Sequence, residues 1–129
     1  MMYNALIGFE RLDGTVTMNY LGSHGGILHA GNILLHNYYN FDEVQKLIEA
    51  NEHEGCGISS FNKDYEPSYY DDGDELVIQY KNKKDAITEF VEGDEIDNFY
   101  LFCEKDEHWY VYSKAEKTLV DLYYAYIRL

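Results

Sequence analysis

An Asp-Gly pair between two alternating apolar runs is the feature that most restricts how this chain folds. The runs "YNALIGFER" and "TVTMNYL" flank Leu12-Asp13-Gly14. Asp-Gly readily adopts the backbone conformations that a tight turn between antiparallel strands requires. We therefore expect a β-hairpin with strands over 3–11 and 15–21.

A second hairpin is expected near the C-terminus, where "NFYLFCEKDEHWYVYS" reverses direction at Glu104–Glu107. A further strand is expected over 74–80. Each hairpin carries an apolar face, and matched apolar faces favour one shared sheet. The residues of these faces are Ile7, Phe9, Val16 and Met18 in the first hairpin, and Tyr100, Phe102 and Val111 in the second.

Helical patterns lie between the hairpins. Segment 27–38 has apolar residues three and four apart, and Gly31 within it indicates close packing on a neighbour. Asn40 and Glu43 form a capping-box pattern that opens a helix over 42–50. In "KKDAITEFVE" a short helix is expected, with four apolar residues facing inward: Ala86, Ile87, Phe90 and Val91.

The C-terminal segment has two readings. Ser113 and Glu116 form another capping-box pattern, which predicts a final helix with an apolar stripe formed by Leu119, Leu122, Tyr123 and Tyr126. Tyrosine and isoleucine also favour strands, so helix and strand both stay open for 115–129.

These elements indicate a single α+β domain over residues 1–129. We expect an antiparallel sheet built from the N- and C-terminal hairpins, with two or more helices packed on one face. A chain of this length buries roughly two-thirds of its unfolded surface, which is enough for a real core.

Acidity is the strongest compositional signal. The net charge is −14, and residues 64–107 hold fifteen of the twenty-four acids but four of the ten bases. Such a surface repels nucleic acid and suits a basic partner. The chain also has 14 tyrosines, which are common interface anchors because they bury area and keep one polar end.

The remaining composition points to a cytoplasmic protein. No apolar run approaches the ~20 residues of a membrane span, and the N-terminus lacks the pattern of a signal peptide. Cys56 and Cys103 have no paired spacing, which favours reduced thiols. The oligomeric state is left open between a monomer and a small homo-oligomer.

The glycine-rich turn over 22–26 resembles a ligand loop only in outline. It lacks the lysine of a phosphate-binding loop and the dinucleotide fingerprint. His24, His29 and His36 lack the spacing of a zinc site. Nearby acids would raise the pKa of the Cys56 thiol, and glycines flank it. We expect no cofactor, no metal, no catalytic role for His24 or Cys56, and no enzyme activity.

The segment "NYLGSHGGILHAGNILLHNYYNFDEVQKLIEA" resembles a family of small uncharacterised bacteriophage and prophage proteins. Their pattern is a strand, a His-Trp-Asp-Gly-Tyr-Pro turn, a Gly-x-Ile-Leu helix and a Val-x-x-Leu-Ile helix. The late hairpin also resembles theirs. The matching positions are Tyr20, Gly25, His29, Gly31, Ile33, Leu34, Leu35, Tyr38, Val44, Leu47, Ile48 and Ile58-Ser59-Ser60.

The resemblance breaks at the turn, where Gly22-Ser23-His24 replaces His-Trp-Asp and Gly26-Ile27 replaces Tyr-Pro. It implies a phage origin and a setting in the cytoplasm of an infected bacterium. It implies no reaction. Because glycines persist while polar turn residues change, a structural turn is favoured over a ligand loop.

These features suggest an inhibitor that occupies the basic groove of a host nucleic-acid-binding defence protein, such as a CRISPR nuclease or restriction enzyme, by DNA mimicry. The candidate partner-binding residues are Tyr69, Tyr70, Asp71, Asp72, Asp74, Glu75, Asp94, Glu95 and Asp97. Direct nucleic-acid or membrane binding is not expected. The alternatives are a binder of a signalling nucleotide that uses the glycine-rich turn, and a soluble domain of no enzymatic role.

Overall fold

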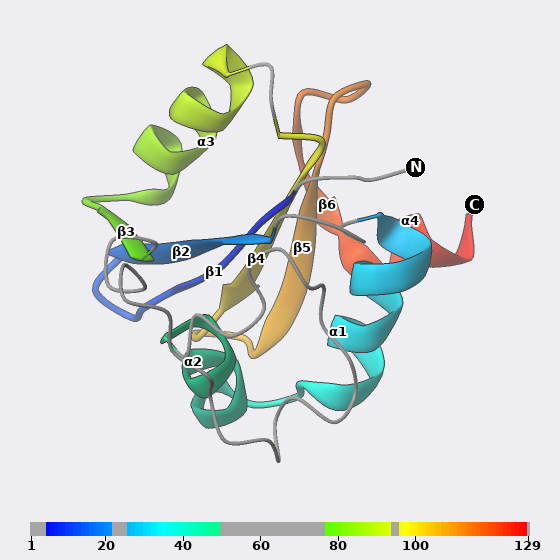
Figure 1. The fold of residues 1–129 in the computed structure, drawn as a ribbon, viewed down its shortest axis with the longest axis horizontal. Coiled ribbons are helices and arrows are strands. Elements are labelled where there is room, and N and C mark those ends of the chain that lie inside the picture. Colours follow the sequence, from blue (N-terminus) through cyan, green and yellow to red (C-terminus); the bar gives the residue numbers. More distant parts are fainter. Residues whose placement is uncertain (1–4, 22–25, 50–76, 94–95, 129) are drawn as a thin grey trace.

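The computed structural model describes residues 5–21, 26–49, 77–93 and 96–128, which form one six-stranded sheet with helices against it (Figure 1). This confirms the predicted α+β class. In chain order the elements are β1 (Ala5–Glu10), β2 (Val16–Leu21), the π-helix η1 (Ile27–Gly31), α1 (Asn32–Asn37), α2 (Phe41–Glu49), β3 (Val77–Tyr80), α3 (Lys83–Glu92), β4 (Asn98–Cys103), β5 (His108–Ser113), β6 (Thr118–Asp121) and α4 (Leu122–Ile127).

The strand order is β3-β2-β1-β4-β5-β6, and the two predicted hairpins are β1–β2 and β4–β5. They join one sheet, as expected. The hairpins meet through β1 and β4, which pair in parallel, with Ile7 opposite Tyr100 and Phe9 opposite Phe102. The other pairings of the described sheet are antiparallel, so the sheet is mixed rather than wholly antiparallel.

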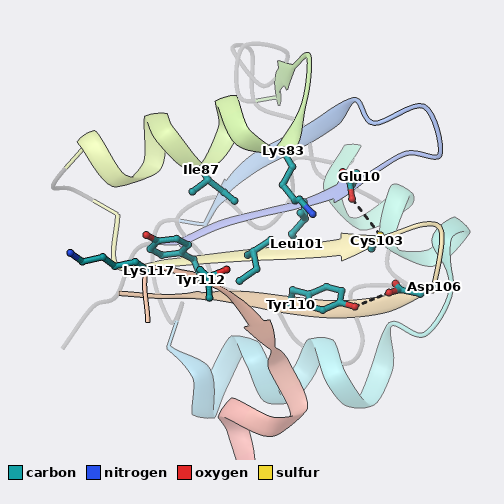
Figure 2. Close-up of a pocket in the computed structure, with 11 residues that line it drawn as sticks. Glu10, Lys83, Ile87, Leu101, Cys103, Asp106, Tyr110, Tyr112 and Lys117 are labelled. Carbon is teal, nitrogen blue, oxygen red and sulfur yellow. Dashed lines mark hydrogen bonds between the residues drawn. The ribbon is translucent and has the colours of Figure 1, made fainter. Parts of the chain in front are cut away.

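One face of the sheet is covered by η1, α1, α2 and α4. Ile7, Phe9 and Phe102 pack there against Leu34 of α1 and Leu47 of α2. The two helical segments predicted over 27–38 and 42–50 therefore lie on one face, as expected. Figure 2 shows the η1–α1 segment and α4 on the side of the sheet opposite to α3.

The opposite face carries a second core under α3. Leu6, Phe99 and Leu101 pack there with Phe90.

The prediction that Val16 and Met18 share a face with Ile7 and Phe9 was wrong, because both join this second core. Met18 pairs with Gly8 and Val16 with Glu10, and directly paired residues point to the same face. A Cβ at Gly8 would lie 2.1 Å from Met18 Sδ, so glycine is needed at this position.

The first helical segment begins as one π-helical turn and continues as α1. Gly31 packs closely, as predicted, since a Cβ there would lie 3.3 Å from Leu122 Cδ1 of α4. Asn40 caps α2 as predicted, and Glu43 reaches back to the Asn40 side chain rather than to its backbone N–H. The Glu43 N–H donates to Asn40 Oδ1 at 2.9 Å, and Asn40 Nδ2 donates to Glu43 Oε1 at 3.1 Å.

The predicted short helix is α3, and Ala86 and Phe90 are buried as expected while Ile87 is half-buried. The prediction for Val91 was wrong, because its side chain is 52% exposed. Val91 follows Phe90, so it lies about 100° further round the helix and points away from the core.

The predicted start of the last helix at Ser113 was wrong. Ser113 Oγ accepts the Glu116 N–H at 3.1 Å, but the Lys117 N–H donates to Ser113 O at 2.7 Å and Lys117 has a φ of 58°. This left-handed residue reverses the chain into β6. Helix α4 begins only after Asp121, whose carboxylate accepts the Tyr124 N–H at 3.1 Å.

Segment 115–129 therefore contains both a strand and a helix. Leu119 packs in the α3 core and Leu122 in the opposite core, so they do not form one stripe.

Leu34 and Leu47 are 0% and 2% exposed, so alanine at either position should destabilise the fold by about 2–5 kcal/mol. The control is Leu12→Ala, because Leu12 is 73% exposed in the β1–β2 turn and its substitution should change stability by about 0.5 kcal/mol or less. Urea unfolding followed by circular dichroism gives both values. Near-neutral results for Leu34→Ala and Leu47→Ala would contradict this packing.

Candidate functional site

Of the nine residues predicted to contact a partner, Asp97 is the one that the structure describes. It is exposed immediately before β4 and lines a cavity with the β5–β6 turn and α4. The other eight predictions lie outside the described residues: Tyr69, Tyr70, Asp71, Asp72, Asp74, Glu75, Asp94 and Glu95. The same holds for His24, for Cys56 and for most of the glycine-rich turn.

The described residues place a different group of acids together. Because β1 and β4 run in the same direction, the turns that follow them lie at the same end of the sheet (Figure 1). The Glu104 N–H donates to Glu10 O at 2.9 Å, and the Leu12 N–H donates to Glu104 Oε1 at 3.1 Å. We define the acidic end as the acids of this region: Glu10, Asp13, Glu104, Asp106 and Glu107.

Neutral donors hold these carboxylates. Asp13 accepts the Thr15 N–H at 2.9 Å and the Thr15 hydroxyl at 2.7 Å, and these hydrogen bonds lower the pKa of Asp13. Glu107, which has a φ of 49°, accepts the Phe41 N–H at the start of α2 at 3.3 Å. The turns are thus fixed to each other and to α2, with their carboxylates in defined positions.

The acidic end also keeps its charge. Within the described part of the chain, none of its five carboxylates forms an ion pair with a lysine or arginine. Neutral hydrogen-bond donors position a carboxylate without cancelling its charge. Arg11 stabilises the charge of Asp13 at longer range, but the acidic end as a whole is a negative surface without lysine or arginine ion pairs, which a cationic group can contact.

A groove of about 420 Å³ begins at the acidic end and runs along the α3 face of the sheet (Figure 2). Lys83 and Ile87 come from α3, while Leu101 of β4 and Tyr110 and Tyr112 of β5 lie across from them. Helix α3 packs over the core formed with β1, β2 and β4. Among the described elements no second helix covers the β5–β6 half of this face, which leaves the groove open.

Asp106 and Tyr110 form one polar contact of the groove. The Tyr110 hydroxyl donates to Asp106 Oδ2 at 2.7 Å, and this hydrogen bond, helped by burial, raises the pKa of Tyr110 to about 12. The bond fixes the tyrosine ring along the strand. Tyr110 therefore stays protonated, and remains a donor to Asp106, to a higher pH than an ordinary tyrosine does.

Cys103 and Glu10 form a second polar contact. The Cys103 thiol donates to Glu10 Oε1 at 3.4 Å. Burial and this hydrogen bond raise the pKa of the Cys103 thiol. Since the thiolate is the nucleophilic form, this environment disfavours nucleophilic chemistry at Cys103.

The His108–Asp121 pair lies beside Tyr110, whose ring meets the His108 ring edge-on at a centroid distance of 5.4 Å. Burial acts to raise the pKa of Asp121, but hydrogen bonds from His108 and from the Tyr124 N–H outweigh it and lower the pKa. Asp121 also caps α4, so the pair connects β5 to that helix. Among the described residues no three His, Cys, Asp or Glu side chains converge on a metal position.

Sequence reasoning missed the acidic end because its members come from two hairpins far apart in the chain. Glu104–Glu107 was recognised as an acidic turn, but Glu10 and Asp13 lie in a segment with few acids. The predicted cluster at 94–97 precedes β4, whereas the acidic end follows β4. At about 3.3 Å per residue, the six-residue strand separates Asp97 from the acidic end by roughly 20 Å.

No protein-family model, curated protein or solved structure matches this chain. In the described part of the chain, none of the helices has the length and apolar character that crossing a bilayer requires.

The hydrogen bond to Asp106 should control the ionisation of Tyr110. In Asp106→Asn the pKa of Tyr110 should fall from about 12 toward its ordinary value of 10.0. Because the folded pKa is raised, Tyr110 contributes stability that is fully present below pH 10 and is lost as pH rises toward 12. NMR titration of tyrosines labelled with ¹³C at Cζ measures the shift directly.

Tyr80 is the internal control for this titration. Its pKa is also raised to about 12, by burial first and then by Glu89, so Asp106→Asn should leave it unchanged. An unaltered Tyr110 titration in the variant would contradict the assigned cause.

Proposed function

We propose that this protein is an acidic inhibitor that occupies the basic groove of a nucleic-acid-binding protein, and that its target is a defence enzyme of a phage-infected bacterium. The observation that carries the proposal is the net charge of −14, together with the carboxylates of the acidic end, none of which forms an ion pair with a lysine or arginine of the described residues. In the proposed complex, the phosphate-binding groove of the partner contacts the carboxylates of this protein.

Charge matching supports this choice of partner. Duplex DNA carries one negative charge per about 1.7 Å of helix axis, and proteins that bind it present arginine and lysine to phosphates. Arginine binds a carboxylate through the same two-pronged geometry that it uses for phosphate. The acidic end offers several carboxylates on two adjacent turns, so one basic surface can contact more than one of them.

Aromatic anchors would complement the charges. An exposed ion pair contributes only about 0–1 kcal/mol, so charge alone gives weak and salt-sensitive binding. Tyrosines at an interface add buried area. The tyrosines Tyr69 and Tyr70 precede the acids 71–75 in the sequence, and Tyr110 lies against Asp106 at the acidic end.

The first experiment identifies the partner by capture from host lysate at two salt concentrations. One dominant nucleic-acid-binding enzyme, released by salt, is the expected result. A salt-insensitive partner without a nucleic-acid site would contradict the proposal.

Amide substitution then tests which acids carry the binding. Three variants replace acids by matching amides at 71–75, at 94–97, and at Glu104 and Glu107. Each variant whose cluster contacts the captured enzyme should bind it at least tenfold more weakly. Its affinity should also depend less on salt, because fewer counterions are released on binding. Folding should survive or improve, because like-charge repulsion is relieved.

Lys105→Gln is a control with the opposite change in charge. Lys105 lies in the same turn as Glu104 and Glu107, and this substitution removes a positive charge instead of negative ones. It should tighten binding rather than weaken it. If all three amide variants bind as well as the wild type at low salt, the acidity is only a solvated surface and the proposal is wrong.

A further inference from the structure

The groove between α3 and strands β4 and β5 has charged side chains in its lining. At the acidic end it holds two carboxylates, Glu10 of β1 and Asp106 of the β4–β5 turn (Figure 2). Among the described residues, Glu10 accepts a hydrogen bond from the Cys103 thiol and Asp106 accepts one from the Tyr110 hydroxyl. A carboxylate has about four acceptor positions, so both retain capacity for a further donor.

We propose that this groove receives an arginine side chain of the basic partner, with its guanidinium group between Glu10 and Asp106. The inference rests on the proposed function and assigns it a specific contact. A guanidinium group has five N–H donors in a plane, which suits two carboxylates that come from different elements. An ammonium group is a compact point charge and fits such a divided site less well.

The rest of the lining suits the arginine stem. Leu101 provides apolar surface on the groove floor, and the Tyr110 ring is held in place by its bond to Asp106. Arginine packs its aliphatic stem on apolar surface, and its guanidinium group is attracted to aromatic faces. An arginine in the groove would thus make a charge contact and also bury the area of its stem, whereas a surface ion pair makes only the charge contact.

A cation fits this groove better than an anion does. The protein carries a net charge of −14, so its long-range field attracts cations and repels anions. Lys83 of α3 and Lys117 of the β5–β6 turn also line the groove, and Lys117 lies at the end opposite to Asp106 (Figure 2). Lys83 projects toward the carboxylates, so it opposes an arriving cation and would assist an arriving anion.

Whether removing the Lys83 charge strengthens or weakens ligand binding therefore distinguishes a cationic ligand from an anionic one. The probes are N-acetyl-arginine amide, its neutral citrulline analogue and adenosine monophosphate, each titrated into the full chain and followed by NMR. The arginine probe should shift the resonances of Leu101 and Tyr110. Glu10→Gln and Asp106→Asn should each weaken its binding at least threefold, and Lys83→Gln should tighten it at least twofold.

Glu92→Gln is the matched control. Glu92 is exposed at the last position of α3 and does not line the groove, so its loss of one negative charge should leave the affinity for the arginine probe within twofold. Thermal melting of each variant establishes that it is folded.

Three results would overturn the proposal: no groove shift up to the solubility limit of the arginine probe, equal binding of the citrulline analogue, or tighter binding of the nucleotide that is lost in Lys83→Gln. The last result would make the groove an anion site. If the groove variants bind the captured enzyme like the wild type while the Glu104 and Glu107 amide variant does not, the groove assignment fails and the proposed function stands.

Discussion

The parallel pairing of β1 with β4 is the constraint on which the rest of the structure depends. It joins two hairpins into one sheet and buries both strands at its centre, with Ile7 and Phe102 on one face and Leu6 and Phe99 on the other. It also fixes the direction of the two hairpins relative to each other. Because both central strands run the same way, the turns that follow them meet at one end, and this brings the five carboxylates together.

Gathering these carboxylates has an electrostatic cost, because like charges on adjacent turns repel. The fold offsets it locally with neutral donors: the Leu12 N–H for Glu104, the Phe41 N–H for Glu107 and the Tyr110 hydroxyl for Asp106. Lys105 lies in the same turn and Lys83 lines the adjacent groove, but neither forms an ion pair with these carboxylates in the described residues, so their charge is left available to a cationic group.

Local signals in the sequence predicted the local structure well. Asp13-Gly14 marked the first hairpin, and Asn40 with Glu43 marked the start of α2, because turn and cap chemistry depends on neighbouring residues. The Ser113–Glu116 pattern misled, since the same side-chain contact occurs in a helix cap and in the turn that Lys117 closes.

Features that depend on distant residues escaped prediction. The faces of Val16 and Met18 follow from their register against Glu10 and Gly8, and either face was compatible with their alternation. The acidic end needs the parallel contact of β1 with β4, which no short pattern specifies. The groove likewise forms because α3 covers only part of its face of the sheet, and the position of α3 on the sheet depends on tertiary packing.

Competition with DNA tests the charge mimicry most directly. The dominant nucleic-acid-binding enzyme captured from host lysate is held at fixed concentration with a fluorescent duplex, and this protein is titrated in. Mimicry predicts full displacement of the duplex, with an apparent affinity that falls in proportion as the duplex concentration is raised and that weakens steeply with salt. A stable ternary complex of enzyme, duplex and this protein would contradict it.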